Sequence, residues 1–179
     1  MTAAKGFAGV VLVGFMGSGK SSVGRELARR IGAEFVDVDS WIEKKASCPI
    51  RVLFEREGEP AFREREKSAL KEILSEKGRV VATGGGAFLD EGNRKLLKEY
   101  GPVVYLEVEA DTVLRRLAKD TRRPLLRCDD REAVVRDLLD RRIPGYRQAD
   151  HALSTEGRTV EEIAERIVEL IKTREGGCS

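Results

Sequence analysis

The sequence predicts an α/β fold in which a parallel sheet is covered by helices on both faces. Two observations carry this prediction. Short apolar runs rich in β-branched residues alternate with longer stretches of helical periodicity, and the first of these runs, residues 10–13, contains no polar residue at all. An unbroken apolar strand is typical of a sheet buried on both sides. Strands that alternate with helices are typical of βαβ units.

The elements follow one another in a regular order. The predicted strands are residues 10–13, 34–39, 79–82, 103–108 and 151–155. The predicted helices are residues 20–31, one that opens at Ser40, 49–74 with an interruption at "EGEPAF", 91–99, 110–117, 132–142 as far as Pro144, and a last one after residue 159. Ser40 with Glu43, and Thr159 with Glu162, have the spacing of capping boxes, so each pair is expected to open a helix.

The composition excludes several classes of protein. Charged residues make up 36% and hydrophobic residues 41% of the 179 residues, and the net charge is +2, which favours neither disorder nor a nucleic-acid partner. No apolar run approaches the roughly 20 residues that span a membrane. The three cysteines are too scattered for a disulfide framework or a zinc site. We expect residues 1–179 to form one domain, a cytoplasmic monomer that binds small molecules.

The stretch "VVLVGFMGSGKSSVGREL", residues 10–27, matches the P-loop pattern at Gly14, Gly19, Lys20 and Ser21. Glycines let backbone N–H groups turn toward phosphate oxygens, the lysine neutralises the β- and γ-phosphates, and the hydroxyl ligates Mg²⁺. A dinucleotide site is the alternative, but Ser22 stands where its third glycine is needed. The predicted phosphate-binding residues are Gly17, Ser18, Gly19, Lys20, Ser21 and Ser22.

Two carboxylates come next along the chain. Asp37 and Asp39 stand two apart on the predicted second strand, so we expect them to point to the same side at the carboxyl edge of the sheet. One carboxylate could hold magnesium and the other could accept a hydrogen bond from a substrate hydroxyl. The alternative for Asp39 is a helix cap beside Ser40. Because the third strand ends in "RVVAT" and offers no carboxylate, Asp37 is the better candidate to complete the metal shell.

Three further segments could bind an acceptor or a transferring phosphate. Arg63 and Glu66, at i and i+3, could hold a substrate carboxylate, or could form an ordinary exposed ion pair. "TGGG", residues 83–86, allows a close approach of backbone to ligand, or is a plain loop. The basic segment 118–130 could close over the γ-phosphate, or could be a solvated charge run.

Taken together and in this order, the motifs "GFMGSGKS", "DVD", "GEPAFRERE", "ATGGGAF", "RRPLL" and "RRIPGYR" closely resemble those of the shikimate kinase family, over residues 14 to 147. The resemblance implies a nucleoside-monophosphate-kinase-like fold whose five-stranded parallel sheet has the order 2-3-1-4-5. It also implies transfer of the γ-phosphate of ATP, with Mg²⁺ as cofactor, to the 3-hydroxyl of shikimate.

The resemblance also implies a role for each matched residue. Asp39 would bind ring hydroxyls, Arg63 and Arg142 would clamp the carboxylate, Glu66 would orient Arg63, and Gly85 with Gly86 would approach the ring. On the nucleotide side, Arg123 of the lid (about 118–130) would reach the phosphates. Arg116 would lie against the adenine, with Arg158 the loosest match there. Asp37 would support magnesium or act near the attacking hydroxyl. The substrate-binding helical segment would span about residues 40–75.

Two rival functions follow from the same residues. A gluconate-type or nucleoside monophosphate kinase would share the fold, but a nucleotide acceptor needs a base-reading pocket that Asp39, Arg63 and Arg142 do not supply. A guanine-nucleotide switch would need an N-K-x-D element, and the only asparagine, Asn93, stands in "GNRK".

Overall fold

The computed structural model describes residues 7–118 and 130–175, so residues 119–129, with Arg123 and most of the predicted lid, lie outside it. The sheet is entirely parallel and has the order β2-β3-β1-β4-β5, as predicted. Its strands are β1 (Val10–Val13), β2 (Glu34–Asp37), β3 (Arg79–Ala82), β4 (Val103–Glu107) and β5 (His151–Ser154).

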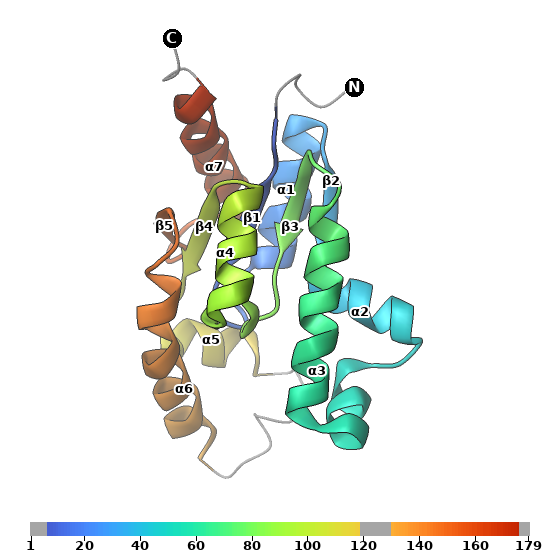
Figure 1. Ribbon diagram of the computed structural model, residues 1–179. Helices are drawn as coiled ribbons and strands as arrows, with labels where there is room; N and C mark the ends of the chain where they lie inside the picture. The colour runs from blue at the N-terminus through green and yellow to red at the C-terminus, as the bar shows by residue number, and fades with distance from the viewer. Residues whose placement is uncertain (1–6, 119–129, 176–179) are drawn as a thin grey trace.

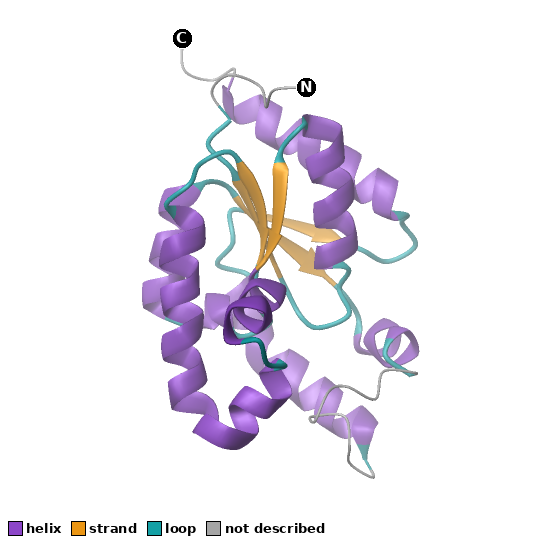
Figure 2. Cartoon of the chain, turned by 90° about the vertical axis from the view of Figure 1, so that its right-hand side faces the viewer, coloured by secondary structure: helices purple, strands orange, loops and turns teal. Residues whose placement is uncertain are grey.

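The helices cover both faces of the sheet (Figures 1 and 2). They are α1 (Lys20–Ile31), α2 (Val38–Ala46), α3 (Ile50–Leu74), α4 (Glu91–Tyr100), α5 (Ala110–Arg116), α6 (Arg131–Tyr146) and α7 (Val160–Glu175), with a short 3₁₀ turn, η1 (Ala87–Leu89). No helix in these described parts is long and apolar enough to cross a membrane.

The apolar strand β1 contributes to two cores. Val10 and Leu12 are buried on the side covered by α1 and α7, whereas Val11 and Val13 are buried on the side of α3, α4 and α6. Side chains alternate across a strand, so a strand covered on both faces must be apolar at every position. This burial fixes β1 at the centre of the sheet and presents its carboxyl end to the loop that follows.

Two sequence-based predictions about helix boundaries are wrong. The second strand ends at Asp37 instead of residue 39, because the Asp37 carboxylate accepts the Ser40 N–H at 3.1 Å and so caps α2 three residues early. Ser40 therefore lies inside the helix. Glu43, the other half of the predicted capping box, accepts the N–H of Ile50 at 2.9 Å, at the start of α3.

Other boundary predictions have mixed outcomes. The capping box at α7 is confirmed, since Thr159 and Glu162 exchange hydrogen bonds of 2.8 and 3.2 Å. The interruption at "EGEPAF" is also confirmed, because Gly58 breaks α3 with φ 79° and ψ 171°. The last predicted stop is wrong: α6 continues through Pro144 to Tyr146, since a proline near a helix end removes only one backbone bond.

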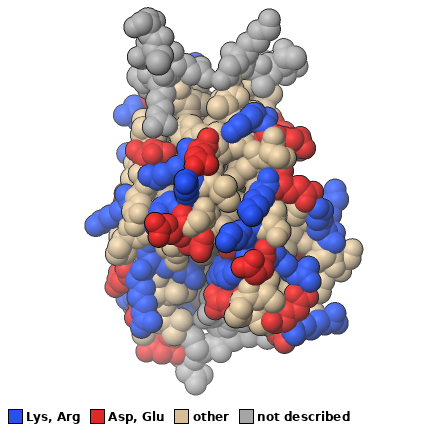
Figure 3. Space-filling view, viewed as in Figure 1, with Lys and Arg blue, Asp and Glu red and all other residues tan. Residues whose placement is uncertain are grey.

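The surface carries charges of both signs. On the face seen in Figure 3, Lys and Arg side chains are interspersed with Asp and Glu. Ion pairs also form along single helices, as between Arg51 and Glu55 of α3. This face therefore carries no large field of one sign.

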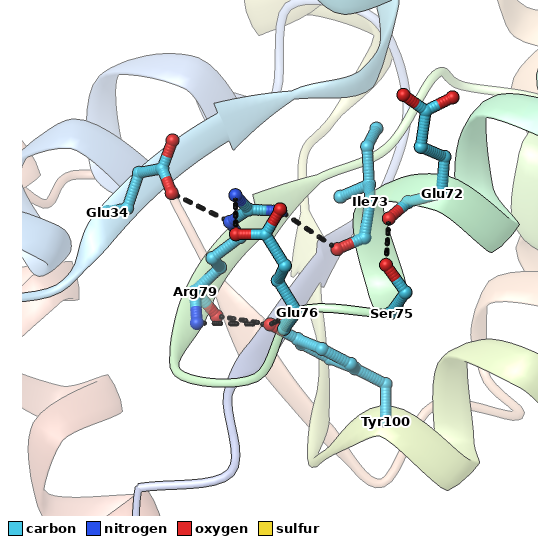
Figure 4. Close-up of polar contacts among 7 residues, drawn as sticks. All are labelled: Glu34, Glu72, Ile73, Ser75, Glu76, Arg79 and Tyr100. Carbon is cyan, nitrogen blue, oxygen red and sulfur yellow. Dashed lines mark hydrogen bonds and ion pairs between the residues drawn. The ribbon is translucent and has the colours of Figure 1, made fainter.

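Arg79 joins three elements at the amino end of β3 (Figure 4). Its guanidinium donates to Glu34 of β2 at 2.7 Å, to the Ile73 carbonyl of α3 at 3.2 Å, and to Glu76. Its backbone N–H donates to the Tyr100 hydroxyl of α4 at 3.0 Å, and that hydroxyl donates to the Glu76 carbonyl at 3.1 Å. The cluster therefore fixes β2, α3 and α4 against β3.

Replacing Arg79 by methionine is expected to lower the free energy of unfolding by about 1–3 kcal/mol, because the Ile73 carbonyl loses a charged donor. Arg79 and Gly84 are five residues apart, which is about 16 Å at the rise of an extended strand. The kinetic constants should therefore stay as in the wild type. Urea denaturation and steady-state assays would check both points. A variant as stable as the wild type would contradict this structural role.

Candidate active site

The phosphate loop connects β1 to α1. Its last residue, Gly19, has φ 92°, a left-handed conformation that favours glycine, and α1 begins at the next residue. The Lys20 ammonium donates to the carbonyls of Gly14 at 2.9 Å and Phe15 at 2.8 Å, so it lies folded over the loop. Ser18 is buried, whereas Ser22 is exposed on the first turn of α1. The strand, loop and helix N-terminus together form an anion-binding concavity.

Ser21 and Asp37 meet at the head of this loop. The Ser21 hydroxyl donates to Asp37 Oδ2 at 2.6 Å. The strand β3 lies between β1 and β2, so these two residues are not on neighbouring strands. The two residues nevertheless meet because α1 contacts both β2 and β3 on its return path. The crossover helix, not strand pairing, brings the carboxylate to the phosphate loop.

The pair of oxygen donors fits a hard divalent cation. A hydroxyl and a carboxylate are ligands that Mg²⁺ accepts, and Mg²⁺ takes its remaining ligands from nucleotide phosphates and water. In the described parts of the chain no group of three or more His, Cys, Asp or Glu side chains could hold a metal on its own. A magnesium ion here would therefore arrive with the nucleotide.

Asp37 and Asp39 do not share one side of a strand, which corrects the sequence-based prediction. Asp39 lies in the first turn of α2, two residues beyond Asp37, which both ends β2 and caps the helix. A Cβ atom placed on Gly84 would lie 2.6 Å from Asp39 Oδ1, so Asp39 points toward the glycine run. The capping alternative weighed for Asp39 belongs to Asp37 instead.

Each of the three consecutive glycines faces charged side chains. A Cβ on Gly84 would meet the carboxylates of Asp39 and Glu66, one on Gly85 would meet Arg142 Nη1 at 3.2 Å, and one on Gly86 would meet the Arg63 guanidinium at 2.8 Å. Gly84, Gly85 and Gly86 therefore form a glycine floor that is surrounded by charged side chains from α2, α3 and α6. Gly84 lies within the predicted glycine segment, although the family resemblance implied a substrate contact only for Gly85 and Gly86.

Arg63 is held by Glu66 from the next turn of α3. Arg63 Nη1 lies 2.8 Å from Glu66 Oε2, and the Glu66 side chain is only 1% exposed. Burial raises the pKa of Glu66, the nearby Asp39 and Asp90 carboxylates raise it further, and the hydrogen bond from Arg63 opposes this rise. Partial burial lowers the pKa of Arg63, but Glu66 and Glu59 hold it above its ordinary value.

Arg142 approaches the same floor from α6. Its Nη1 donates to the Gly85 carbonyl at 3.3 Å, and its guanidinium carbon lies 5.7 Å from the centre of the Phe15 ring. The Tyr146 hydroxyl donates to the same carbonyl, and the buried Tyr146 ring stacks on Tyr105 at 5.1 Å. Sequence reasoning gave Tyr146 and Phe15 no role, although both stand inside quoted motifs.

The residues predicted for the adenine side lie on neighbouring segments. Arg116, at the end of α5, donates to the Gly17 carbonyl at 2.9 Å, whereas Arg158 donates to the Ser154 carbonyl at 2.8 Å. Glu156, which sequence reasoning missed, links the two segments because it accepts from the Glu109 N–H at 2.9 Å and the Thr112 hydroxyl at 2.8 Å. Glu156 is separated from Thr112 by 44 positions and from Glu109 by 47, so no spacing pattern in the sequence could have revealed these contacts.

The sheet order, the phosphate loop and the charged floor beside it define a P-loop phosphotransferase for a small acceptor. The sequence profile of shikimate kinase matches residues 16–172. The chain belongs to the shikimate kinase family, whose members are ATP-dependent phosphotransferases.

Individual relatives agree with this membership. A shikimate kinase of Francisella philomiragia is 48% identical over 160 residues, which cover 88% of this chain and 91% of that protein. The structure of a shikimate kinase from Acinetobacter baumannii in complex with shikimate superposes with a TM-score of 0.89 at 43% identity, covering 93% of each chain. A gluconokinase from Sinorhizobium meliloti, at 19% identity and a TM-score of 0.63 over 97% of this chain and 99% of that one, shares the fold alone.

Proposed function

We propose that this protein transfers the γ-phosphoryl group of Mg²⁺-bound ATP to the 3-hydroxyl of shikimate. The observation that carries the acceptor is the convergence of Asp39, Arg142 and Arg63 on three consecutive glycines. A carboxylate suits ring hydroxyls, and two guanidiniums suit one substrate carboxylate. The Acinetobacter baumannii relative, which is described in complex with shikimate, supports this reading.

The chain's own residues divide the chemistry between them. Lys20 and the backbone of Gly17 to Ser22 hold the phosphates, and Lys20 offsets the charge that develops during transfer. Ser21 and Asp37 would hold the magnesium ion, which when bound neutralises phosphate charge. Asp37 also lies at the carboxyl edge of the sheet, where it can orient the attacking hydroxyl or accept its proton. Arg116 and Arg158 would lie beside the adenine.

The proposal also includes the domain organisation, the oligomeric state and a lid. Residues 1–179 act as one kinase domain and as a monomer in the cytoplasm. Residues 40–75 bind the acceptor, and residues 118–130 act as a lid that brings Arg123 to the transferring phosphate. Replacing Arg123 by alanine should therefore lower kcat.

An acceptor panel tests the proposed activity. Purified protein with Mg²⁺-ATP would be offered shikimate, gluconate and nucleoside monophosphates, with ADP release followed by a coupled assay. We expect turnover with shikimate alone. Good turnover of gluconate or a nucleotide, without turnover of shikimate, would move the chain to another acceptor within the same fold.

Gly86→Ala is expected to lower kcat/KM for shikimate roughly 10- to 100-fold, because its new methyl group would displace the Arg63 guanidinium from its present position. Gly86 has φ −104°, which alanine adopts without strain, so the variant should fold. The KM for ATP serves as the internal control and should not change. An unaltered shikimate KM would argue against Arg63 as a substrate ligand.

A further inference from the structure

Arg63 binds two carboxylates of its own helix at once. Its Nη1 donates to Glu66 at 2.8 Å, while its Nη2 and Nε both donate to one oxygen of Glu59, at 2.9 and 3.2 Å. The two glutamates together engage all three nitrogen atoms of the guanidinium. These contacts use three of the five N–H donors, and Glu59 covers the Nε–Nη2 edge, so a substrate carboxylate that binds this edge in a two-pronged contact must displace Glu59.

Only one of the two glutamates can leave at low cost. The Glu66 side chain is 1% exposed and faces the glycine run, whereas the Glu59 side chain is 64% exposed. A buried carboxylate that loses its arginine is left without compensation, whereas an exposed one is taken up by water. Glu66 is therefore the permanent anchor of Arg63, and Glu59 is the exchangeable partner.

The backbone of α3 holds Glu59 in this position. Gly58, with its left-handed φ of 79°, breaks the helix just before Glu59, and the second half of the helix then restarts. Glu57 and Arg65 make two hydrogen bonds of 2.7 and 2.8 Å across this break. Glu59 consequently lies one turn before Arg63, at the i, i+4 spacing that favours an ion pair.

We propose that Glu59 is a specificity-determining residue, whose carboxylate occupies part of the Arg63 guanidinium in the free enzyme and must be displaced by the carboxylate of the acceptor. This inference rests on the proposed function, in which Arg63 binds that carboxylate. In this exchange Arg63 loses its exposed ion pair with Glu59 and forms one with the substrate carboxylate, which also binds Arg142. A polyol without a carboxylate cannot make the exchange, so Glu59 penalises only acceptors that use Arg63.

The test compares Glu59→Gln with the wild type. The variant should bind shikimate about two- to fivefold more tightly, the range that loss of one exposed competing ion pair allows. Both the KM for shikimate and the Kd from titration calorimetry without nucleotide should fall, and the KM for ATP should not. A role limited to helix stability would not tighten binding, so an unchanged or raised Kd would overturn the proposal.

Glu55→Gln is the matched control, because Glu55 forms an exposed i, i+4 ion pair with Arg51 at 2.8 Å in the same helix. An equal gain in Glu55→Gln would reduce the effect to general charge and would overturn the proposal. Glu59→Gln in an Arg63→Ala background should have no effect, and a persistent gain there would also overturn it. If Arg63→Ala alone leaves the shikimate Kd unchanged, the error lies in the proposed role of Arg63 instead.

Discussion

Lys20→Ala is expected to abolish measurable turnover, with a loss of at least about 10³-fold in kcat. The Lys20 ammonium lies over the phosphate loop, within 2.9 Å of the Gly14 and Phe15 carbonyls. When phosphates enter the loop, this charge can move to their oxygens and offset the negative charge that is redistributed during transfer. Alanine leaves the backbone N–H groups in place, so nucleotide binding should weaken less than turnover.

Lys98→Ala provides the control for this prediction, since Lys98 lies on α4 and pairs with Asp150 at 3.6 Å. It should keep wild-type kinetics. Circular dichroism would establish that Lys20→Ala is folded, and coupled assays with saturating Mg²⁺-ATP would measure its kcat. A folded Lys20 variant with kcat within tenfold of the wild type would refute the catalytic assignment.

The second large effect is expected for Arg142→Ala, which should weaken shikimate binding by about 2–5 kcal/mol. Arg142 reaches the glycine floor from α6, where its Nη1 donates to the Gly85 carbonyl, and no other residue of α6 brings a cation there. Its loss leaves Arg63 as the remaining arginine for the substrate carboxylate. The KM for shikimate should therefore rise steeply while the KM for ATP stays close to its wild-type value.

Arg141 offers a matched comparison because it precedes Arg142 on the same helix. Its side chain is 74% exposed and pairs with Asp137 at 2.9 Å. Arg141→Ala should leave the shikimate KM unchanged. Arg142→Lys should recover part of the lost affinity, since it restores the charge but not the two-pronged geometry. Equal effects of the Arg141 and Arg142 variants would count against a specific clamp.

The phosphate-binding half of the site could be predicted from the sequence because its residues are close together in the chain. Gly14 to Ser21 are continuous in the chain, as a loop and the first residues of the helix that follows it, so the chemistry follows from spacing alone. The sheet order was a different matter. Alternating strands and helices predicted a parallel sheet, but the order 2-3-1-4-5 came from the family resemblance and is confirmed by the structure.

The acceptor half of the site could not be derived from spacing, because it depends on contacts between distant elements. Gly85 and Arg142 are 57 positions apart, yet one donates to the other. The prediction that Asp37 and Asp39 point to the same side of a strand is wrong for a local reason. Two-residue periodicity holds only within a strand, and the Asp37 cap ended the strand before Asp39. A helix cap thus sends one carboxylate to the phosphate loop and the other to the glycine floor.

Glu59 shows a third kind of limit. In the sequence it is one of many glutamates on a charged helix, where an i, i+4 ion pair with arginine is ordinary and weak. Its proposed role as an exchangeable partner depends on Arg63, which also binds the buried Glu66 and faces Gly86. Burial and a shared partner cannot be read from the spacing of charges.

The most direct test of the proposed acceptor site compares phosphorylation of shikimate with that of its methyl ester, in the wild type and in Arg142→Ala. The ester keeps the ring hydroxyls but removes the charge that Arg63 and Arg142 are proposed to bind. The wild type is expected to prefer shikimate by at least about 100-fold in kcat/KM, and Arg142→Ala is expected to lose most of this preference. Equal rates for shikimate and ester in the wild type would contradict it.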